Sequence, residues 1–379
     1  MTSFLRVFVH HSTRREICKS CARRGGGQKK EETGVKKILA AVSGGVDSAA
    51  AAAMLQRAGY ETACATMLLC SGAEREAESA RRTAEQLGLP FYLFDWREEF
   101  SRLVQRPFLE SYRAGLTPNP CIVCNKTVKF GLFLEKALSL GFDAVATGHY
   151  ARVEQDAQTG RWTVRTGADR QKDQSYMFWT LSQRQLSHIL TPLGGMNKEQ
   201  TRALAAELGL FAADRHDSQD ICFVPDGDYM TFLTAHGLIP TAGRFRGENG
   251  EDYGAHRGME AYTLGQRRGL SVAAGKRIYV TGKRGADVFL GSEQTLMRRR
   301  VALREVNWQA VEKPDGPLRA QARLRYTPQT AACTVCPLPD GAELVFDEPQ
   351  RAPTPGQSAV FYEDGRILGG GIIAEAFAE

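Results

Sequence analysis

Residues 43–48, Ser-Gly-Gly-Val-Asp-Ser, have the composition and order of a loop that binds phosphate groups. They follow the apolar run at residues 38–42, which predicts a buried β-strand, and precede residues 49–55, which predict a helix. The glycines let the backbone turn so that its N–H groups converge on an anion, and the helix N-terminus adds positive partial charge there. The loop contains no Gly-Lys-Ser/Thr, which excludes the Walker arrangement with its lysine on the outer phosphates.

Cysteines supply a second kind of chemistry at two places in the chain. Cys121 and Cys124 have metal-ligand spacing within residues 117–125, where two prolines predict a loop and argue against a helix. Cys222 lies farther along, between an acidic segment and a phenylalanine. The chain has nine cysteines and no secretory segment, so we expect reduced thiols, catalytic groups or metal ligands and not a disulfide framework.

Alternating strands and helices must position these groups. Strands are predicted at residues 38–42, 61–69, 91–94 and 143–147, and helices at 49–55, 73–87 and 129–140. Strands separated by helices of this length predict a parallel sheet, hence an α/β fold. Ligands of such sheets bind beyond the carboxyl ends of the strands, where the loop at 43–48, Met67 and Gly148 would all lie.

The sequence pattern changes beyond Cys222, where short apolar runs alternate with turns that contain Gly, Pro and Asp. These runs predict β-rich structure with a boundary near residues 295–300. We therefore expect a disordered basic extension at 1–35, a nucleotide-binding α/β domain at 36–215, a central β-rich domain at 216–297 and a C-terminal β-barrel-like domain at 298–379.

The net charge of +6 is concentrated in the first residues of the chain. Residues 1–37 carry a net charge of +7, so the remainder carries −1, and bulk charge argues little for RNA binding by the folded part. Local basic clusters argue for it, namely Arg267-Arg268, Lys276-Arg277, residues 298–300, and Arg323 with Arg325. No apolar run approaches a membrane span, and we expect a cytoplasmic protein that does not bind membranes.

The motifs resemble those of a known family. Residues 43–48 resemble the SGGxDS pyrophosphate loop of the PP-loop ATP pyrophosphatases. Together with residues 117–125, 146–150, 172–176 and 222–223, the chain resembles the MnmA family, the tRNA-specific 2-thiouridylases. The similarity continues through residues 265–269, Arg325-Tyr326 and residues 355–360, and covers roughly residues 36–379.

The resemblance implies a reaction sequence. ATP with Mg²⁺ adenylates the C2 oxygen of the wobble uridine, and pyrophosphate and later AMP are released. Cys222 receives a persulfide from a sulfur-donor protein, either a cysteine desulfurase or a relay carrier. Its terminal sulfur attacks the activated carbon or is released as hydrosulfide, and Cys124 attacks the persulfide, which leaves a disulfide between Cys124 and Cys222. An external reductant restores both thiols.

The resemblance also assigns binding residues. The tRNA anticodon stem-loop is the implied partner, with an unstacked base held beside Arg and Tyr side chains. The implied ATP contacts are Ala41, Val42, Ser43, Gly44, Gly45, Val46, Asp47, Ser48, Met67 (against adenine) and Gly148. The implied tRNA contacts are Asn119, Pro120 and Cys121 at the target base, and His149, Lys172, Asp173, Gln174, Arg325, Tyr326 and Gln357 elsewhere.

Cys121 departs from the family pattern, because many members have aspartate at this position. An alternative to the persulfide route is that Cys121, Cys124 and Cys222 supply three thiolates to a [4Fe–4S] cluster, whose open iron carries sulfide to the base. Two further functions are compatible with the loop: a PP-loop ligase acting on a small molecule, and a catalytically silent RNA-binding module. The pairs Cys18/Cys21 and Cys333/Cys336 have zinc-like spacing but no partner pair, and we interpret them as coincidental.

Overall fold

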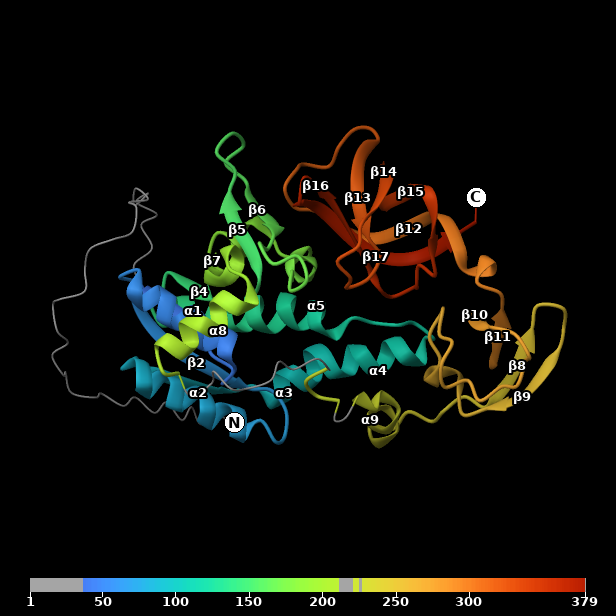
Figure 1. The fold of residues 1–379 in the computed structure, drawn as a ribbon, viewed down its shortest axis with the longest axis horizontal. Helices are drawn as coiled ribbons and strands as arrows, with labels where there is room; N and C mark the ends of the chain where they lie inside the picture. Colours follow the sequence, from blue (N-terminus) through green and yellow to red (C-terminus); the bar gives the residue numbers. More distant parts are fainter. Residues whose placement is uncertain (1–36, 211–220, 225–226, 379) are drawn as a thin grey trace. The chain divides into compact units, whose positions relative to one another are not determined.

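The computed structural model of the protein describes residues 37–210, 221–224 and 227–378 (Figure 1). These residues form two compact units. The first contains residues up to Arg97, Leu132–His149 and the stretch that starts at His188; the second contains Glu98–Gly131, Tyr150–Ser187 and the remainder from residue 218. The predicted extension at 1–35, with Cys18 and Cys21, lies outside the described residues.

The first unit is built on a five-stranded sheet in which every pairing is parallel. The strand order is β3 (Phe91–Asp95), β2 (Glu61–Leu68), β1 (Lys37–Ala41), β4 (Ala144–Ala146) and β7 (Ile189–Leu190). Its helices are α1 (Val46–Arg57), α2 (Glu74–Leu87), α6 (Phe133–Ser139) and α8 (Lys198–Glu207). The predicted parallel α/β fold is confirmed.

Small residues allow close packing around the central strand. Ile38 and Leu39 of β1 are fully buried, and α1 buries a run of five alanines, Ala49–Ala53. A helix face of alanines can approach a sheet closely because no long side chain separates the two backbones. The amphipathic helix α2 buries Ala77, Ala80 and Ala84 in the same way.

The segment that carries Cys121 and Cys124 is helical, so the prediction of a loop over residues 117–125 is wrong in its second half. Helix α5 (Pro120–Cys124) continues through a π-helical stretch, Asn125–Leu132, into α6. Pro120 occupies the first helical position, where the missing N–H has no helical partner to lose. The Asn119 side chain accepts a hydrogen bond from the Ile122 N–H at 3.4 Å and caps the helix.

The remaining helices of the second unit are short. A helical segment runs from α3 (Arg97–Phe100) through a π-helical stretch, Ser101–Gln105, into α4 (Arg106–Arg113). Helix α7 (Gln183–Leu186) follows a capping box, and α9 (Tyr229–Ala235) precedes the central β-rich module. No helix in the described part of the chain is both long and apolar enough to cross a bilayer.

The central module of the second unit contains a four-stranded sheet. Its order is β10 (Tyr279–Arg284), β11 (Asp287–Gly291), β8 (Gly243–Gly247) and β9 (Asp252–His256). The buried residues Phe245, Val280, Val288 and Leu290 form its core.

The C-terminal module is a closed barrel, because β12 pairs with both β15 and β17. The ring runs β12 (Met297–Trp308), β15 (Gly341–Arg351), β14 (Ala331–Leu338), β13 (Leu318–Arg323), β16 (Ser358–Glu363) and β17 (Arg366–Phe377). A hairpin of β5 (Ala151–Gln155) and β6 (Trp162–Thr166), which the sequence did not predict, joins this sheet where Arg366 pairs with Arg165. The predicted β-rich domains, including a barrel, are confirmed.

A buried ion pair ties the segment after the hairpin to the barrel. The Arg323 guanidinium donates to the Asp173 carboxylate at 2.5 Å, and the two side chains are 2% and 1% exposed. Asp173 also accepts from the Gly167 N–H and the Ser175 hydroxyl, both at 2.9 Å. The guanidinium carbon of Arg323 lies 4.8 Å from the centroid of the Tyr362 ring. Both charges thus have partners that compensate for lost water.

Replacing Asp173 with alanine should leave the Arg323 charge buried and uncompensated. We expect Asp173→Ala to lower the free energy of unfolding by about 3–5 kcal/mol, measured by urea denaturation. Asp347→Ala, which breaks the exposed Arg319–Asp347 pair, is the matched control and should change stability little. Equal effects of the two substitutions would contradict a special role for the buried pair.

Candidate active site

The phosphate-loop residues form a compact turn at the carboxyl end of β1. The Ser48 hydroxyl accepts from the Ser43 N–H and donates to the Gly45 carbonyl, both at 3.0 Å. Gly44 has φ +76°, and a Cβ there would lie 2.6 Å from the Ser79 Cβ, so the turn packs directly against α2. Gly45 has no side chain to cap α1, and the N-terminus of this helix contributes positive partial charge at the loop.

Two further predicted ATP contacts lie at the same edge of the sheet. A Cβ on Gly148 would lie 2.7 Å from the Asp47 carbonyl carbon and 2.8 Å from the Ser48 nitrogen, so the segment after β4 packs on the loop. Met67 is half-buried and lies two residues beyond the last residue of β2 that pairs with β1. The predicted convergence of residues 43–48, Met67 and Gly148 matches this geometry. His149 is buried, with its Nδ1 2.7 Å from the Thr147 hydroxyl.

Lys198 is a site residue that sequence reasoning missed. Its ammonium donates to both carboxylate oxygens of Asp47, at 2.7 and 2.8 Å, and the residue is 8% exposed. It lies 151 positions from Asp47, at the first residue of α8. The capping box of Asn197 and Gln200 marks a helix start in the sequence, but no local pattern indicates that this helix begins beside the loop.

The helices α1 and α8 hold Lys198 in place by running in parallel. Arg57 in the last turn of α1 pairs with Glu207 in the last turn of α8 at 2.8 Å. At their other ends, Asp47 pairs with Lys198. The ammonium of a lysine therefore lies at Asp47, near the end of a loop whose own sequence contains no lysine.

The two cysteines of α5 differ in exposure and share one basic neighbour. Cys121 is exposed and Cys124 is buried, on neighbouring turns of one helix face. Burial raises the pKa of the Cys124 thiol; the nearby Lys129 ammonium partly offsets this, and Cys121 adds to the rise. Loss of surrounding water likewise raises the pKa of Cys121, and Lys129 again opposes the shift. Both thiols are protonated at neutral pH in this state.

A loop of the barrel holds the backbone that leads into α5. The Gln357 side-chain amide donates to the Thr117 carbonyl at 2.9 Å and to the Pro118 carbonyl at 3.4 Å. The Thr117 N–H donates to the Pro355 carbonyl at 3.1 Å. A Cβ on Gly356, at φ +91°, would lie 3.0 Å from the Thr117 nitrogen. The predicted tRNA contact Gln357 is thus engaged with the cysteine segment in this structure.

The other predicted tRNA contacts divide into exposed and internal groups. Tyr326 is 46% exposed, and partial burial, with a smaller contribution from the Asp173 carboxylate, raises the pKa of its hydroxyl. Arg325 donates to the Ala352 carbonyl at 2.9 Å, and Gln174 accepts from the Tyr150 N–H at 3.0 Å. Lys172 is half-buried, and Asp173 belongs to the buried pair described above. Tyr326 and Cys121 are therefore both exposed, whereas Asp173 is buried.

Cys222 is exposed and directly precedes an anchored aromatic residue. Phe223 is buried and packs against Phe108 at 5.3 Å, Phe232 at 5.1 Å and Phe100 at 5.5 Å between ring centroids. The aromatic cluster fixes the backbone beside Cys222 while the thiol-bearing residue stays accessible.

The cysteines do not assemble into a metal site. Among the described residues, no group of three or more His, Cys, Asp or Glu side chains could hold a metal ion, so Cys121, Cys124 and Cys222 do not fit a three-thiolate cluster site.

Cys333 and Cys336 lie three positions apart on β14, and side chains at that spacing point to opposite faces of a strand. Burial raises the pKa of Cys333 to about 12, as expected for an inert core thiol.

The chain is similar to known proteins along most of its length. Family models match residues 36–226 (tRNA methyl transferase HUP domain), 231–287 (tRNA methyl transferase PRC-barrel domain) and 298–373 (Aminomethyltransferase beta-barrel domain). A relative from Acetivibrio thermocellus, named tRNA-specific 2-thiouridylase MnmA, is 42% identical over 84% of this chain and 94% of its own. Relatives with the same name from Syntrophotalea carbinolica and Chloroflexus aggregans are 47% and 44% identical, over 78% and 85% of this chain and 84% and 93% of their own.

The raised pKa of Cys124 predicts how its reactivity depends on pH. In a Cys121→Ser background, alkylation of Cys124 should keep accelerating above the ordinary titration range of cysteine, because only the thiolate reacts. Lys129→Met removes the charge that favours the thiolate, so the pKa rises further and the rate at about pH 8 falls, by less than the roughly tenfold change of one full pKa unit. Peptide mass spectrometry measures the rates.

Lys126→Met is the control for this experiment, because Lys126 is exposed on the same helical segment and has no part in the shift. It should leave the rate unchanged. A faster reaction in Lys129→Met, or an equal slowing in Lys126→Met, would contradict the assigned cause.

Proposed function

The chain belongs to the MnmA family of tRNA-specific 2-thiouridylases, and we propose that it is an enzyme that transfers sulfur to C2 of the wobble uridine in tRNA at the expense of ATP. The proposal is supported by three family models that follow one another along residues 36–373. The observation that carries it is that one unit contains a phosphate loop followed by α1, a helix with no side-chain cap, and the other contains the cysteine helix α5, which Asn119 caps. A ligase acting on a small molecule would need only the first of these.

The loop at residues 43–48 would hold the pyrophosphate portion of ATP while the C2 oxygen attacks the α-phosphate. Backbone N–H groups at the start of α1 suit the developing negative charge, since they are already oriented. The Asp47 carboxylate and the Ser43 and Ser48 hydroxyls are oxygen donors of the kind that Mg²⁺ prefers, and Mg²⁺ bound with ATP would neutralise its phosphates. Met67 and Gly148 remain the proposed adenine and nucleotide contacts.

We assign Lys198 to the pyrophosphate. The loop has no lysine of its own, and the Lys198 ammonium is held beside it by Asp47. A partly buried lysine costs more to desolvate than an exposed one, and the carboxylate compensates that cost while the site is empty. An incoming phosphate would compete with the Asp47 carboxylate for the same ammonium.

Sulfur would reach the base through two cysteines. The terminal sulfur of a Cys222 persulfide attacks C2 of the adenylated uridine, the C2–O bond breaks and AMP leaves. The Cys124 thiolate then attacks Sγ of Cys222. The bond between Sγ and the sulfur attached to C2 breaks, and its electrons remain on the new 2-thio group. The resulting Cys124–Cys222 disulfide is reduced by an external dithiol, and the sulfur comes from a donor protein.

The exposure of the two thiols is consistent with these roles. Cys222 is exposed, as a residue that is loaded by another protein must be. Cys124 is buried with a raised pKa, so it stays protonated until its surroundings change. The thiol that would consume the persulfide is thereby unreactive at rest. Tyr326 and Cys121 would receive the unstacked base, with the tyrosine as a stacking face. ATP and tRNA occur together in the cytoplasm, to which we assign the reaction.

The proposed reaction is tested with unmodified tRNA, ATP, Mg²⁺, a cysteine desulfurase with cysteine as persulfide donor, and a reductant, followed by nucleoside mass spectrometry. The wild-type protein should form 2-thiouridine. Cys222→Ser and Cys124→Ser should each lower product with a persulfide donor by at least about 10³-fold, because no other thiol completes the exchange. Cys336→Ser, a half-buried thiol on β14, should retain full activity. Wild-type protein that forms no 2-thiouridine beside an active relative would overturn the proposal.

Lys198→Met should weaken pyrophosphate and ATP binding on the order of tenfold, measured by calorimetry, because one charge-assisted contact to the phosphates is lost. Binding of AMP, which lacks the outer phosphates, should stay within about twofold. Lys198→Arg keeps the charge and should recover part of the loss. Lys37→Met removes the exposed Lys37–Glu61 pair on the same unit and is the control.

Equal weakening of AMP and pyrophosphate binding in Lys198→Met would mean that Lys198 only maintains the loop. Unchanged pyrophosphate binding would exclude its contact with the phosphates.

A further inference from the structure

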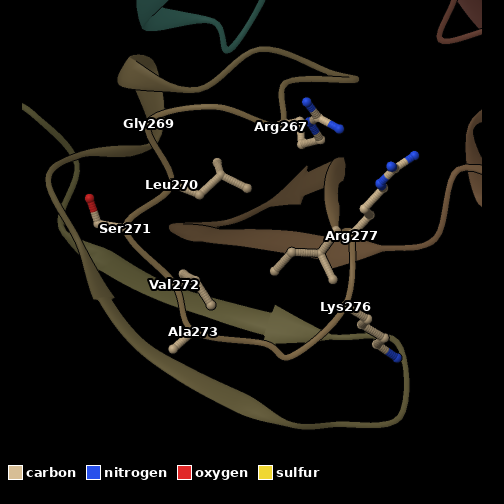
Figure 2. Close-up of a pocket in the computed structure, with 9 residues that line it drawn as sticks. Arg267, Gly269, Leu270, Ser271, Val272, Ala273, Lys276 and Arg277 are labelled. Carbon is tan, nitrogen blue, oxygen red and sulfur yellow. The ribbon is translucent and has the colours of Figure 1, made fainter.

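The central module carries a basic hollow that none of the roles above uses. Its volume is about 540 Å³, and it is lined by Arg267, residues 269–273 and residues 276–278. In the view of Figure 2, Arg267, Lys276 and Arg277 lie along one side of the hollow, and Leu270, Val272 and Ala273 along the other. The three cationic residues are exposed.

The acidic residues of this module are engaged elsewhere. Asp252 pairs with Arg244 at 2.6 Å and Arg246 at 3.0 Å, and Asp287 pairs with Arg246 at 3.2 Å. Glu260 accepts from the Thr241 hydroxyl at 2.7 Å.

No ion pair within 4.0 Å joins Arg267, Lys276 or Arg277 to a carboxylate of the described residues. The pKa of Glu251 is lowered mainly by backbone and Asn249 hydrogen bonds and only slightly by Lys276. The positive charges around the hollow are therefore not neutralised by ion pairs within the described residues and can attract an external anion.

The apolar side of the hollow is continuous with the module's core. Leu270 and Ile278 are 5% and 7% exposed and pack in the same cluster as Phe245 and Val280, with Val272 against it. A free inorganic anion needs no such surface. A nucleotide unit does, because its phosphate carries the charge while its sugar and base present larger, less polar faces. Guanidinium groups also match phosphate geometry through paired N–H donors.

We propose that this basic hollow binds the phosphodiester backbone of the tRNA substrate, at nucleotides other than the target uridine. The inference rests on the proposed function and adds a contact surface to it. Contacts to phosphate and sugar fix register and orientation and carry no sequence information, so the hollow contributes affinity and not the choice of base. Residues 38–379 carry a net charge of only −1, so local clusters of unpaired cations are the source of their electrostatic attraction to RNA.

The test is the salt dependence of tRNA binding by the full chain, measured by fluorescence anisotropy with labelled unmodified tRNA. The double substitution Arg267→Gln and Arg277→Gln should weaken binding at least about tenfold at low salt and reduce the slope of log K against log salt by about 1 to 2. The thiolation rate at saturating tRNA should stay at the wild-type value. A merely structural role would not change the salt slope.

Arg268→Gln is the matched control, because Arg268 has the same charge and is exposed next to Arg267 but does not line the hollow. It should change affinity and slope by less than half as much as the double substitution. An equal effect of Arg268→Gln would show a diffuse charge effect and overturn the proposal. An unchanged slope in the double variant, with wild-type protein that binds and thiolates tRNA, would overturn the hollow alone. Wild-type protein that neither binds nor thiolates tRNA would overturn the proposed function as well.

Discussion

The parallel pairing of β1 with a strand on each side is the constraint from which the nucleotide site follows. Ile38, Leu39 and Ala40 pair with β2 on one side and β4 on the other. Parallel strands end at one edge, so the segments that follow β1, β2 and β4 must come together there. The close approach of Gly148 to Asp47 and Ser48 is the consequence, and any side chain at Gly148 would push the two segments apart. The buried alanines of α1 allow its N-terminus to lie against this edge.

In the second unit, the corresponding constraint is the attachment of the cysteine helix to the barrel. Pro120 and Asn119 start the helix, and Gln357 and Pro355 hold the preceding backbone. The barrel is closed through β12, so its loops have a fixed base from which to position another segment. The family resemblance suggests that Gln357 contacts tRNA, and in this state its amide is engaged with carbonyl groups. Binding of RNA at that residue would therefore act directly on the segment that carries Cys121 and Cys124.

The charged residues discussed above fall into two groups, those in buried or partly buried ion pairs and those exposed on the surface without an ion-pair partner in the described part of the chain. The Arg323–Asp173 pair is buried, the Lys198–Asp47 pair is partly buried, and each charge in them has an opposite partner. Arg267, Lys276 and Arg277 have no such partner among the described residues. They lie along one side of the basic hollow, and its other side is apolar. A cluster of basic residues in a sequence does not distinguish these cases. Arg323 and Arg325 were grouped as one candidate RNA cluster, but Arg323 is 3% exposed and neutralised.

Local pattern determined the strand, loop and helix at residues 38–57, the parallel α/β class and the β-rich second half, because hydrophobic periodicity and glycine placement act over a few residues. The roles of Cys121, Cys124 and Cys222 stay predictions from residue type and motif. The helix at Pro120 was missed because a proline's effect depends on its position in a helix, and that position is visible only once Asn119 is known to cap it. The contact of Lys198 with Asp47 was missed because the two residues are 151 positions apart, and the attachment of the β5–β6 hairpin to the barrel because Arg165 and Asp364 are 199 positions apart. The number of residues between two such positions does not give their distance in space, because tertiary packing determines that distance.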